Sequence, residues 1–413
     1  MQCRVYWCRT LRGFLGWRYV FVLEPVAKLK NNQYKACKCN AAPQQKCRTV
    51  LFRTLLGRAV IFKTKNRSLR QSTLASETKL TLAKLAELAG VSTSTASRAL
   101  NDNPLIKQET RTKIQALAKA HNFSVNAAAS RLRTQKTNVI AVILNLIDNT
   151  EQSTTDPFLL KLVGELNQAL NAKGYELLLS NSFMASDDWA NYFIRSQRAD
   201  GILVIGQGKS DEKIELAAQS GVPIVVWGDA KTEATYPVIG GDNFSGGYSA
   251  TKHLLTQGAK QIIFLGDPEH AEMQERYRGF LRAHEEHGIL PSENAICAID
   301  ITSKSAYQFI NDRIKANGLD FDGIVCVSDM VAFGALKALK ERYVGIPSDV
   351  GIVGYDDISL AELMHPSLTT IKQNTQQAAE LMVAQLINQL ERKPTSSQVV
   401  ETSLVVRRST KHD

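Results

Sequence analysis

The sequence predicts a small all-α module followed by an α/β core of two doubly wound parallel-sheet subdomains. Amphipathic helical patterns fill residues 80–124 without any strand pattern between them. From residue 138 onward, short apolar runs alternate with helical patterns, which is typical of buried parallel strands joined by helical crossovers. The chain of 413 residues is also long enough to bury two or three separate cores.

Basic residues are concentrated at the front of the chain. Residues 1–79 contain 17 Lys and Arg against 2 Asp and Glu, residues 80–136 contain 9 against 3, and residues 137–413 contain 24 against 35. An anionic partner such as nucleic acid is therefore expected at the N-terminal side and not on the acidic core. No apolar run approaches the roughly 18 residues that span a bilayer. The sequence predicts a cytoplasmic protein with no membrane partner.

The basic extension at residues 1–79 holds five of the seven cysteines and shows no sustained helical or strand period. A zinc-bound or nucleic-acid-binding arm is one interpretation, but Cys37 and Cys39 are closer together than zinc ligands usually are. We therefore expect no metal site and no cofactor. The other interpretation is that translation begins downstream, between Val60 and Leu74, and that the extension is disordered or not part of the natural protein.

Residues 80–124 fit a helix-turn-helix domain. A first amphipathic helix ends at Gly90, which suits the left-handed turn that follows, and Ser92 caps a second helix over 93–100. A third amphipathic helix is expected over 108–121. Short hydroxylated side chains on the second helix would let it approach base edges in a major groove. The alternative is a helical hairpin whose Ser- and Thr-rich face is simply exposed.

The segments "TLAKLAELAGVSTSTASRALN" and "VNAAASRLR" together resemble the DNA-binding head and hinge of the LacI/GalR family of transcriptional regulators. In that family two hinge helices of a dimer enter the minor groove, where a leucine wedges between base pairs. The resemblance places the hinge helix and linker at 125–137 and implies a homodimer on palindromic operator DNA. The implied major-groove residues are Leu82, Thr93, Ser94, Ser97 and Arg98; Asn101 would contact a phosphate, and Ala129 and Leu132 the minor groove.

Residues 138–409 resemble the periplasmic sugar-binding-protein fold that the same family uses as its core. The resemblance is carried by segments such as "GDNFSGGYSATKHLL", "SDMVAFGALKAL" and "GYDDISLAELMHPSLTTIKQN". Ligands of such folds bind at the carboxyl ends of the strands. The expected N-subdomain covers about 138–238 and 368–391, and the C-subdomain about 239–367 and 392–409.

A cleft between the subdomains is implied to bind a small carbohydrate effector. Carboxylates and arginine form charge-assisted hydrogen bonds with vicinal hydroxyls, and an aromatic ring covers the apolar face of a sugar. For any one of these residues, a helix cap or a surface ion pair is the alternative role. The implied effector residues are Asp156, Phe158, Asp242, Arg276, Asp329, Asp356 and Gln373.

The sequence therefore predicts a sequence-specific DNA-binding transcriptional regulator, a repressor of carbohydrate-utilisation genes that a small sugar controls allosterically. A carbohydrate-binding protein of the transport type is the alternative, although it gives residues 80–136 no role. An enzyme is not expected, because the glycine-rich "GILVIGQGKS" departs from the phosphate-loop pattern at Leu203. A dimer is the expected assembly, since no leucine heptad follows residue 404.

Overall fold

The computed structural model describes residues 80–123, 136–146, 153–183, 186–207 and 212–411, together with four two-residue strands near the N-terminus. These strands are β1 (Arg4–Val5), β2 (Phe21–Val22), β3 (Phe52–Arg53) and β4 (Ala59–Val60), paired antiparallel as β1 with β2 and β3 with β4. Residues 1–79 form one unit and residues 80–413 another.

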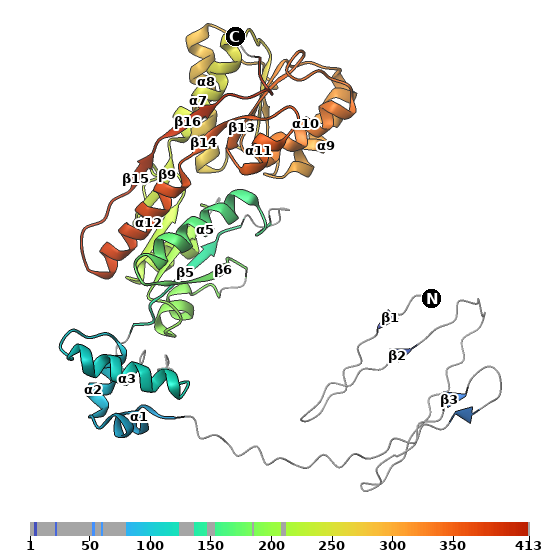
Figure 1. The fold of residues 1–413 in the computed structure, drawn as a ribbon. Coiled ribbons are helices and arrows are strands. Elements are labelled where there is room, and N and C mark those ends of the chain that lie inside the picture. Colours follow the sequence, from blue (N-terminus) through green and yellow to red (C-terminus); the bar gives the residue numbers. More distant parts are fainter. Residues whose placement is uncertain are drawn as a thin grey trace. The chain divides into compact units, whose positions relative to one another are not determined.

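Three helices form the head, residues 80–123: α1 (Leu82–Ala89), α2 (Thr93–Leu100) and α3 (Gln108–Ala120) (Figure 1). The predicted end signals are confirmed, because Gly90 closes α1 in the left-handed conformation (φ 70°) and the Ser92 hydroxyl accepts a hydrogen bond from the Thr95 amide. Leu85, Ala99 and Ile114, one from each helix, are fully buried against one another. Small residues on α2 let it pack closely, and its polar side is left facing outward.

The N-lobe is a six-stranded sheet with helices on both faces (Figure 1). Its strand order is β15-β9-β8-β7-β5-β6, and the strands are all parallel. The elements are β5 (Val139–Leu144), α5 (Pro157–Asn171), β6 (Glu176–Asn181), the π-helical turn η1 (Ala190–Arg195), β7 (Gly201–Ile205), α6 (Glu212–Gln219), β8 (Ile224–Trp227), β9 (Val238–Gly241), α12 (Thr375–Leu390) and β15 (Gln398–Val400).

Strand β5 shows why this sheet is covered on both sides. Ile140, Val142 and Leu144 pack under α5 and α12, whereas Val139 and Ile143 point to the opposite core beneath η1 and α6. Successive side chains alternate between faces, so a continuous apolar run buries both faces. The predicted parallel, doubly wound sheet is confirmed.

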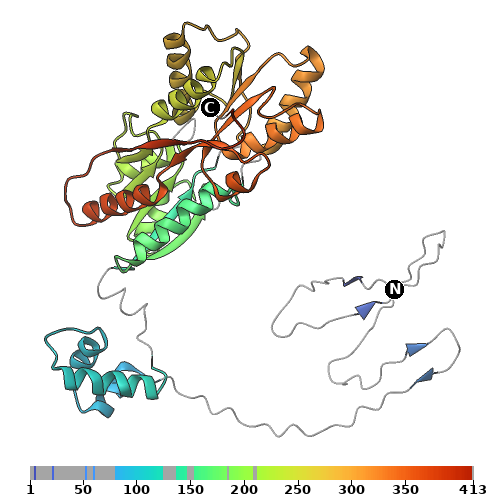
Figure 2. The ribbon, with the colours of Figure 1, turned by 45° about the horizontal axis from the view of Figure 1, so that its top comes forward.

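The C-lobe sheet has the order β11-β10-β12-β13-β14-β16, with only the β14–β16 pair antiparallel. Helix α7 packs on α8, and α9 packs on α10, at the two sides of this lobe (Figure 2). The elements are α7 (Asn243–Thr256), β10 (Ile262–Leu265), α8 (Ala271–His287), β11 (Ile296–Cys297), α9 (Ser303–Asn317), β12 (Gly323–Cys326), α10 (Asp329–Glu341), β13 (Gly351–Asp356), α11 (Ser359–Leu363), β14 (Thr369–Gln373) and β16 (Thr402–Val405).

The chain passes between the lobes three times, and the expected subdomain boundaries are wrong by a few residues at each passage. Strand β9 extends the N-lobe to Gly241, β14 keeps the chain in the C-lobe up to Gln373, and β15 returns residues 398–400 to the N-lobe. The reason is that β14 pairs with the preceding strand β13, whereas β15 pairs with β9, which is distant in sequence. The chain therefore passes from one lobe to the other directly after β9, after β14 and after β15.

Candidate functional site

The outer face of α2 carries the short polar side chains that the sequence predicted. Thr93, Ser94 and Arg98 are exposed on it, and Leu82 at the start of α1 is half-buried. Asn101 closes α2 and is also exposed, with its side-chain amide donating a hydrogen bond to the Ser97 carbonyl (2.9 Å). The face presents hydroxyls and one guanidinium to solvent.

Ser97 differs from this expectation, because its residue is only 6% exposed. It lies between Ala96 and Ala99, which form the buried side of α2, so the core boundary includes it. The expectation of an outward-facing Ser97 is wrong for the described structure. The two expected minor-groove residues, Ala129 and Leu132, lie outside the described residues.

Asp356 and Gln373 meet at the carboxyl ends of neighbouring strands β13 and β14. The Gln373 side-chain amide donates a hydrogen bond to Asp356 Oδ1 (2.8 Å), and the two residues are only 2% and 6% exposed, respectively. Burial raises the pKa of the Asp356 carboxyl well above its ordinary range, while the positive charge of Arg276 acts in the opposite direction. This end of the sheet therefore holds a buried carboxyl group with the chemistry to hydrogen-bond a polar ligand.

Arg276 on α8 lies beside this pair. Its Nε donates to Asn243 Oδ1 (2.9 Å), and the guanidinium carbon is 3.7 Å from the centroid of the Tyr355 ring, a cation–π geometry. Two glycines allow α8 to approach α7 this closely: a Cβ added at Gly247 would lie 2.0 Å from the Arg276 carbonyl oxygen, and one added at Gly279 would meet α7 backbone. The helix crossing thus fixes the position of Arg276.

Asp242 begins α7 directly after the first passage between the lobes. Its carboxylate accepts hydrogen bonds from the Ser245 amide (3.1 Å) and hydroxyl (2.7 Å), so it caps the helix. Lys231, from the N-lobe loop after β8, reaches to 3.7 Å from this carboxylate and 3.6 Å from that of Glu275 on α8. These contacts bring the two lobes together at one point.

The N-lobe contributes Asp156 and Phe158 at the start of α5. Asp156 Oδ1 accepts hydrogen bonds from the Phe158 and Leu159 amides (2.9 and 3.3 Å), and burial raises the pKa of its carboxyl. The Phe158 ring lies 6.3 Å from that of Trp227, which ends β8. Asp156 therefore has the helix-cap role that was the alternative for it, while its charge still acts on Asp356.

Asp329 has both carboxylate oxygens bonded within the protein, and its contact with an effector stays a prediction. Its residue is fully buried, with one carboxylate oxygen accepting from the Ile358 amide (2.9 Å) and the other from the Thr370 hydroxyl (2.5 Å). Burial raises its pKa to about 7. Asp329 joins the start of α10 to β14 and to the loop before α11, so its oxygens are used inside the protein.

Sequence reasoning missed two polar residues at the carboxyl ends of N-lobe strands. Gln207 follows β7 and Asp229 follows β8, and both are at least nine-tenths buried. The Asp229 amide donates a hydrogen bond to Gln207 Oε1 (2.7 Å). The available signal was their position, since a polar residue just after a buried parallel strand lies where ligands of such folds bind.

We name the assembled residues the inter-lobe cluster. It consists of Asp156, Phe158, Gln207, Trp227, Asp229, Lys231, Asp242, Glu275, Arg276, Asp356 and Gln373. In the described ranges, no group of three or more His, Cys, Asp or Glu side chains is placed to hold a metal ion. None of the helices in these ranges combines the length and apolar character that a bilayer crossing requires.

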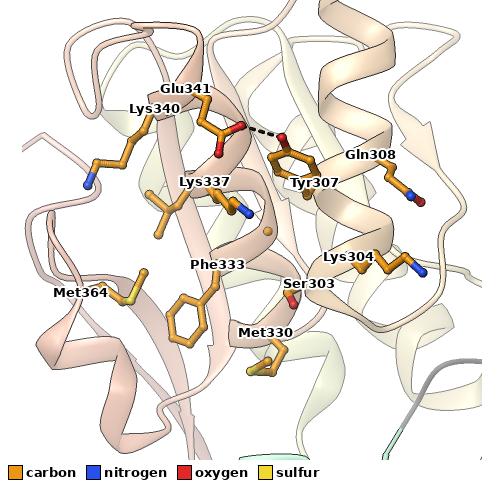
Figure 3. Close-up of a pocket in the computed structure, with 12 residues that line it drawn as sticks. Ser303, Lys304, Tyr307, Gln308, Met330, Phe333, Lys337, Lys340, Glu341 and Met364 are labelled. Atoms are coloured by element: carbon orange, nitrogen blue, oxygen red, sulfur yellow. Dashed lines mark hydrogen bonds between the residues drawn. The ribbon is translucent and has the colours of Figure 1, made fainter. Parts of the chain in front are cut away.

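A separate apolar groove of about 1010 Å³ lies on the C-lobe between α9, α10 and the end of α11 (Figure 3). Phe333, Met330 and Met364 line its floor, with lysines at the rim. Leu363, the last residue of α11 and the chain neighbour of Met364, is 77% exposed.

Two family models match the chain. Residues 81–126 match the family described as bacterial regulatory proteins, lacI family, and residues 251–410 match the periplasmic binding protein-like domain. The transcriptional regulator RegA of Clostridium saccharobutylicum is 29% identical over 79% of this chain and 98% of that protein. The transcriptional repressor PurR of Proteus mirabilis is 31% identical over 80% of this chain and 96% of that protein.

Solved structures have the same fold. A complex of the transcriptional regulator CelR with cellobiose superimposes with a TM-score of 0.60 at 25% identity, covering 80% of this chain and 99% of that one. A lac repressor dimer bound to operator gives a TM-score of 0.69 at 24% identity, covering 80% and 98%. A helix-turn-helix head joined to a two-lobed periplasmic-binding-protein-like core defines a class of transcriptional regulators. Within that class, this chain belongs to the LacI family of bacterial regulatory proteins, as its sequence predicted.

Proposed function

We propose that this protein is a repressor of carbohydrate-utilisation genes whose operator affinity changes when a small sugar binds in the inter-lobe cluster. The observation that carries the proposal is the convergence of Asp356, Gln373 and Arg276 with side chains of the N-lobe at the strand ends. Each carboxylate and amide there is a partner for a hydroxyl group. A ligand that bridges the lobes would alter their separation, and such coupling typically changes the partner affinity about 5- to 150-fold.

A sugar is favoured over other small molecules by the pairing of this polar edge with Phe158 and Trp227. The two rings lie at the N-lobe side, tilted by 47°. A pyranose offers an apolar face to a ring and hydroxyls at its edge. The cellobiose complex of CelR, a relative in fold at 25% identity, supports the same ligand class.

A purine base is the second candidate effector. It is favoured by the 31% identity to the PurR repressor of Proteus mirabilis. A flat heterocycle would also fit beside Phe158, with its edge atoms bonded to Asp356 or Gln373. Sugars and purines are distinguished by direct binding measurements on the same preparation.

The active unit would be a homodimer on palindromic operator DNA, and a second copy of the chain would occupy the apolar groove of the C-lobe. Two heads are needed to contact two symmetric half-sites about one helical turn apart. The groove supports this role, because Phe333 and the exposed Leu363 would leave water when two copies meet. In this arrangement Thr93, Ser94 and Arg98 would lie in the major groove, and Asn101 at a phosphate.

The test combines operator binding with effector binding on the full chain. Fluorescence anisotropy with a palindromic operator selected from random DNA should give specific binding that Arg98→Ala weakens by about 1–3 kcal/mol. Lys113→Ala, on the exposed side of α3, is the matched control for loss of one positive charge. Adding mono- and disaccharides should shift the operator affinity for one of them. Equal affinity for operator and random DNA, with and without every sugar, would reject the proposal.

A further inference from the structure

We propose that the inter-lobe cluster selects an uncharged or cationic effector and rejects an anionic one such as a sugar phosphate. This inference rests on the proposed function, because it concerns the ligand of the same site. The charge of the effector is left open by the proposed sugar class, because free sugars, amino sugars and sugar phosphates share their ring and most hydroxyls.

Acidic side chains outnumber basic ones at this site. Among the described residues the cluster contains five carboxylates, from Asp156, Asp229, Asp242, Glu275 and Asp356. Three cations face them: Lys231 and Arg276 within the cluster, and Arg278, which pairs with Glu275 (2.5 Å) and has a largely exposed side chain. An added phosphate would enter beside acidic side chains that outnumber the cations five to three, at a site where burial weakens solvent screening.

The cations present are already engaged. Arg276 uses Nε on Asn243 and Nη1 on the Val327 carbonyl, and its flat side covers the Tyr355 ring. Lys231 lies between the carboxylates of Asp242 and Glu275. A phosphate group would have to displace these contacts to gain a cation, whereas a hydroxyl group would not.

The side-chain amide of Gln207 gives an independent indication of the ligand's chemistry. Its Oε1 accepts from the Asp229 amide (2.7 Å), while its Nε2 is buried and has no hydrogen-bond partner among the residues that the structure describes. Gly228 makes room for this amide, because a Cβ there would lie 2.3 Å from Gln207 Oε1. A buried donor without a partner is costly, so a ligand that accepts a hydrogen bond would be stabilised here.

The neighbouring Asp229 carboxylate restricts which acceptor fits. Burial raises the pKa of Asp229, and the charges of Glu275 and Asp242 raise it further. A hydroxyl oxygen can accept from Gln207 Nε2 while its proton is donated to Asp229. A phosphate oxygen only accepts at neutral pH and would place its charge beside this carboxylate. Donor and acceptor together therefore match a hydroxyl group, which free sugars and amino sugars both carry.

Isothermal titration calorimetry on the full chain tests this selection. A panel of free mono- and disaccharides, with hypoxanthine included, identifies the best uncharged ligand. The same sugar carrying a phosphate, or, for the purine, inosine monophosphate compared with inosine, is then titrated in the same buffer, together with the amino counterpart of the ligand where one exists. We expect the phosphorylated form to bind at least about tenfold more weakly, a difference of about 1.4 kcal/mol. The amino form should bind at least as tightly as the uncharged one.

The outcomes separate this inference from the proposed function. A phosphorylated ligand that binds equally or more tightly overturns the inference and leaves sugar control intact. Binding of hypoxanthine and of no sugar, with inosine bound more tightly than its monophosphate, would retain the charge rule and reject the sugar. If no uncharged or amino compound binds, the inference is overturned.

Variants connect the selection to named side chains. Asp229→Asn should reduce the discrimination against the phosphorylated ligand several-fold, and Lys231→Met should not reduce it. Asp312→Asn, an exposed acid on α9, is the matched control that should leave the ratio unchanged. If Asp229→Asn does not fold, Glu275→Gln has the same expected direction. An unchanged ratio in a folded variant would contradict the role of these carboxylates.

Discussion

At the scale of single residues, the internal hydrogen bonds of Asp329 contrast with the effector-binding role that we propose for Asp356. Asp329 and Asp356 are both acids near strand ends, and both are buried. Asp329 gives both oxygens to the protein, to the Ile358 amide and the Thr370 hydroxyl. Asp356 shares one oxygen with Gln373, which belongs to the same cluster. Residue type alone does not separate these roles, because partners from distant strands decide them.

The pKa of Asp329 makes the stability of the fold depend on pH. Burial raises this pKa from 3.8 to about 7 in the folded chain, so the folded state keeps a proton that the unfolded state releases. Its contribution to stability is therefore complete below about pH 3.8 and is lost as the pH rises towards 7. In Asp329→Asn, the free energy of unfolding should fall less steeply across this window than in the wild type, by up to about 1.4 kcal/mol per pH unit.

Urea denaturation of both proteins at a series of pH values measures this slope. Asp312→Asn is again the control, since it removes an exposed carboxylate. Parallel slopes for wild type and Asp329→Asn would show that another group causes the pH dependence.

Several residues of the inter-lobe cluster could be named from sequence because they lie in recognisable local patterns, and their binding role stays a prediction. Arg276 and Asp356 lie in segments that resemble the family, and the structure brings both to the same strand ends. The burial of Ser97 and the position of Gln207 depend on packing between elements, which no local pattern contains. The sequence therefore predicts which segments meet at the strand ends better than it predicts the complete set of residues that lie there.

At the scale of secondary-structure elements, the crossing of α7 and α8 is the contact that sets the position of the arginine. Gly247 and Gly279 face the partner helix at the point of closest approach, where a Cβ would lie 2.0 and 2.1 Å from backbone oxygens. Helix axes come this near only where side chains are missing. The sequence predicts helical patterns between the strands of the core, but not how closely two such helices cross, since periodicity gives the face of a helix and not its distance from a neighbour.

Gly279→Ala should therefore destabilise the protein and weaken effector binding together. The methyl group would strike the Phe244 carbonyl, and overpacking of this kind costs about 1–3 kcal/mol of unfolding free energy. Displaced α8 would carry Arg276 away from the cluster. Urea denaturation and effector titration measure the two effects.

The matched control is Gly164→Ala on α5. A Cβ there meets nothing within 4 Å, so the change should stabilise the protein by about 0.5–1 kcal/mol through helix propensity. A Gly279→Ala variant that behaves like this control would show that α7 and α8 can separate without loss.

Strands were predicted well where they are central and apolar, and poorly at the edges. β5, β7 and β12 appear where apolar runs placed them. β11 has two residues and β15 three, and both owe their existence to a partner strand. The shifted subdomain boundaries follow from the same cause, because strand pairing, of β14 with β13 and of β15 with β9, determines to which lobe each strand belongs.

At the scale of the whole molecule, dimer formation through the apolar groove should control operator binding. Leu363→Asp places a charge on the apolar surface beside the groove, and we expect it to weaken the dimer at least about tenfold, or 1.4 kcal/mol. Operator affinity should fall with it, since one head contacts only one half-site. Sedimentation velocity and operator anisotropy on the same samples measure both quantities.

Leu290→Asp serves as the control for an equally drastic surface change. Its residue is 90% exposed and lies outside the lining of the groove. Dimerisation that is unaffected by Leu363→Asp would place the second copy on another face of the protein.

The three passages between the lobes have a consequence for how this protein could evolve or be re-engineered. Two passages adjoin residues of the inter-lobe cluster: Asp242 follows β9, and Gln373 ends β14. The third passage adjoins Thr402, whose hydroxyl donates a hydrogen bond to the Asp242 carbonyl (3.2 Å). The connecting segments are thus built from the same side chains that would grip a ligand. Substitutions at these positions would therefore change ligand specificity and lobe movement together. A variant with a new ligand specificity would also differ in how strongly that ligand changes its operator affinity.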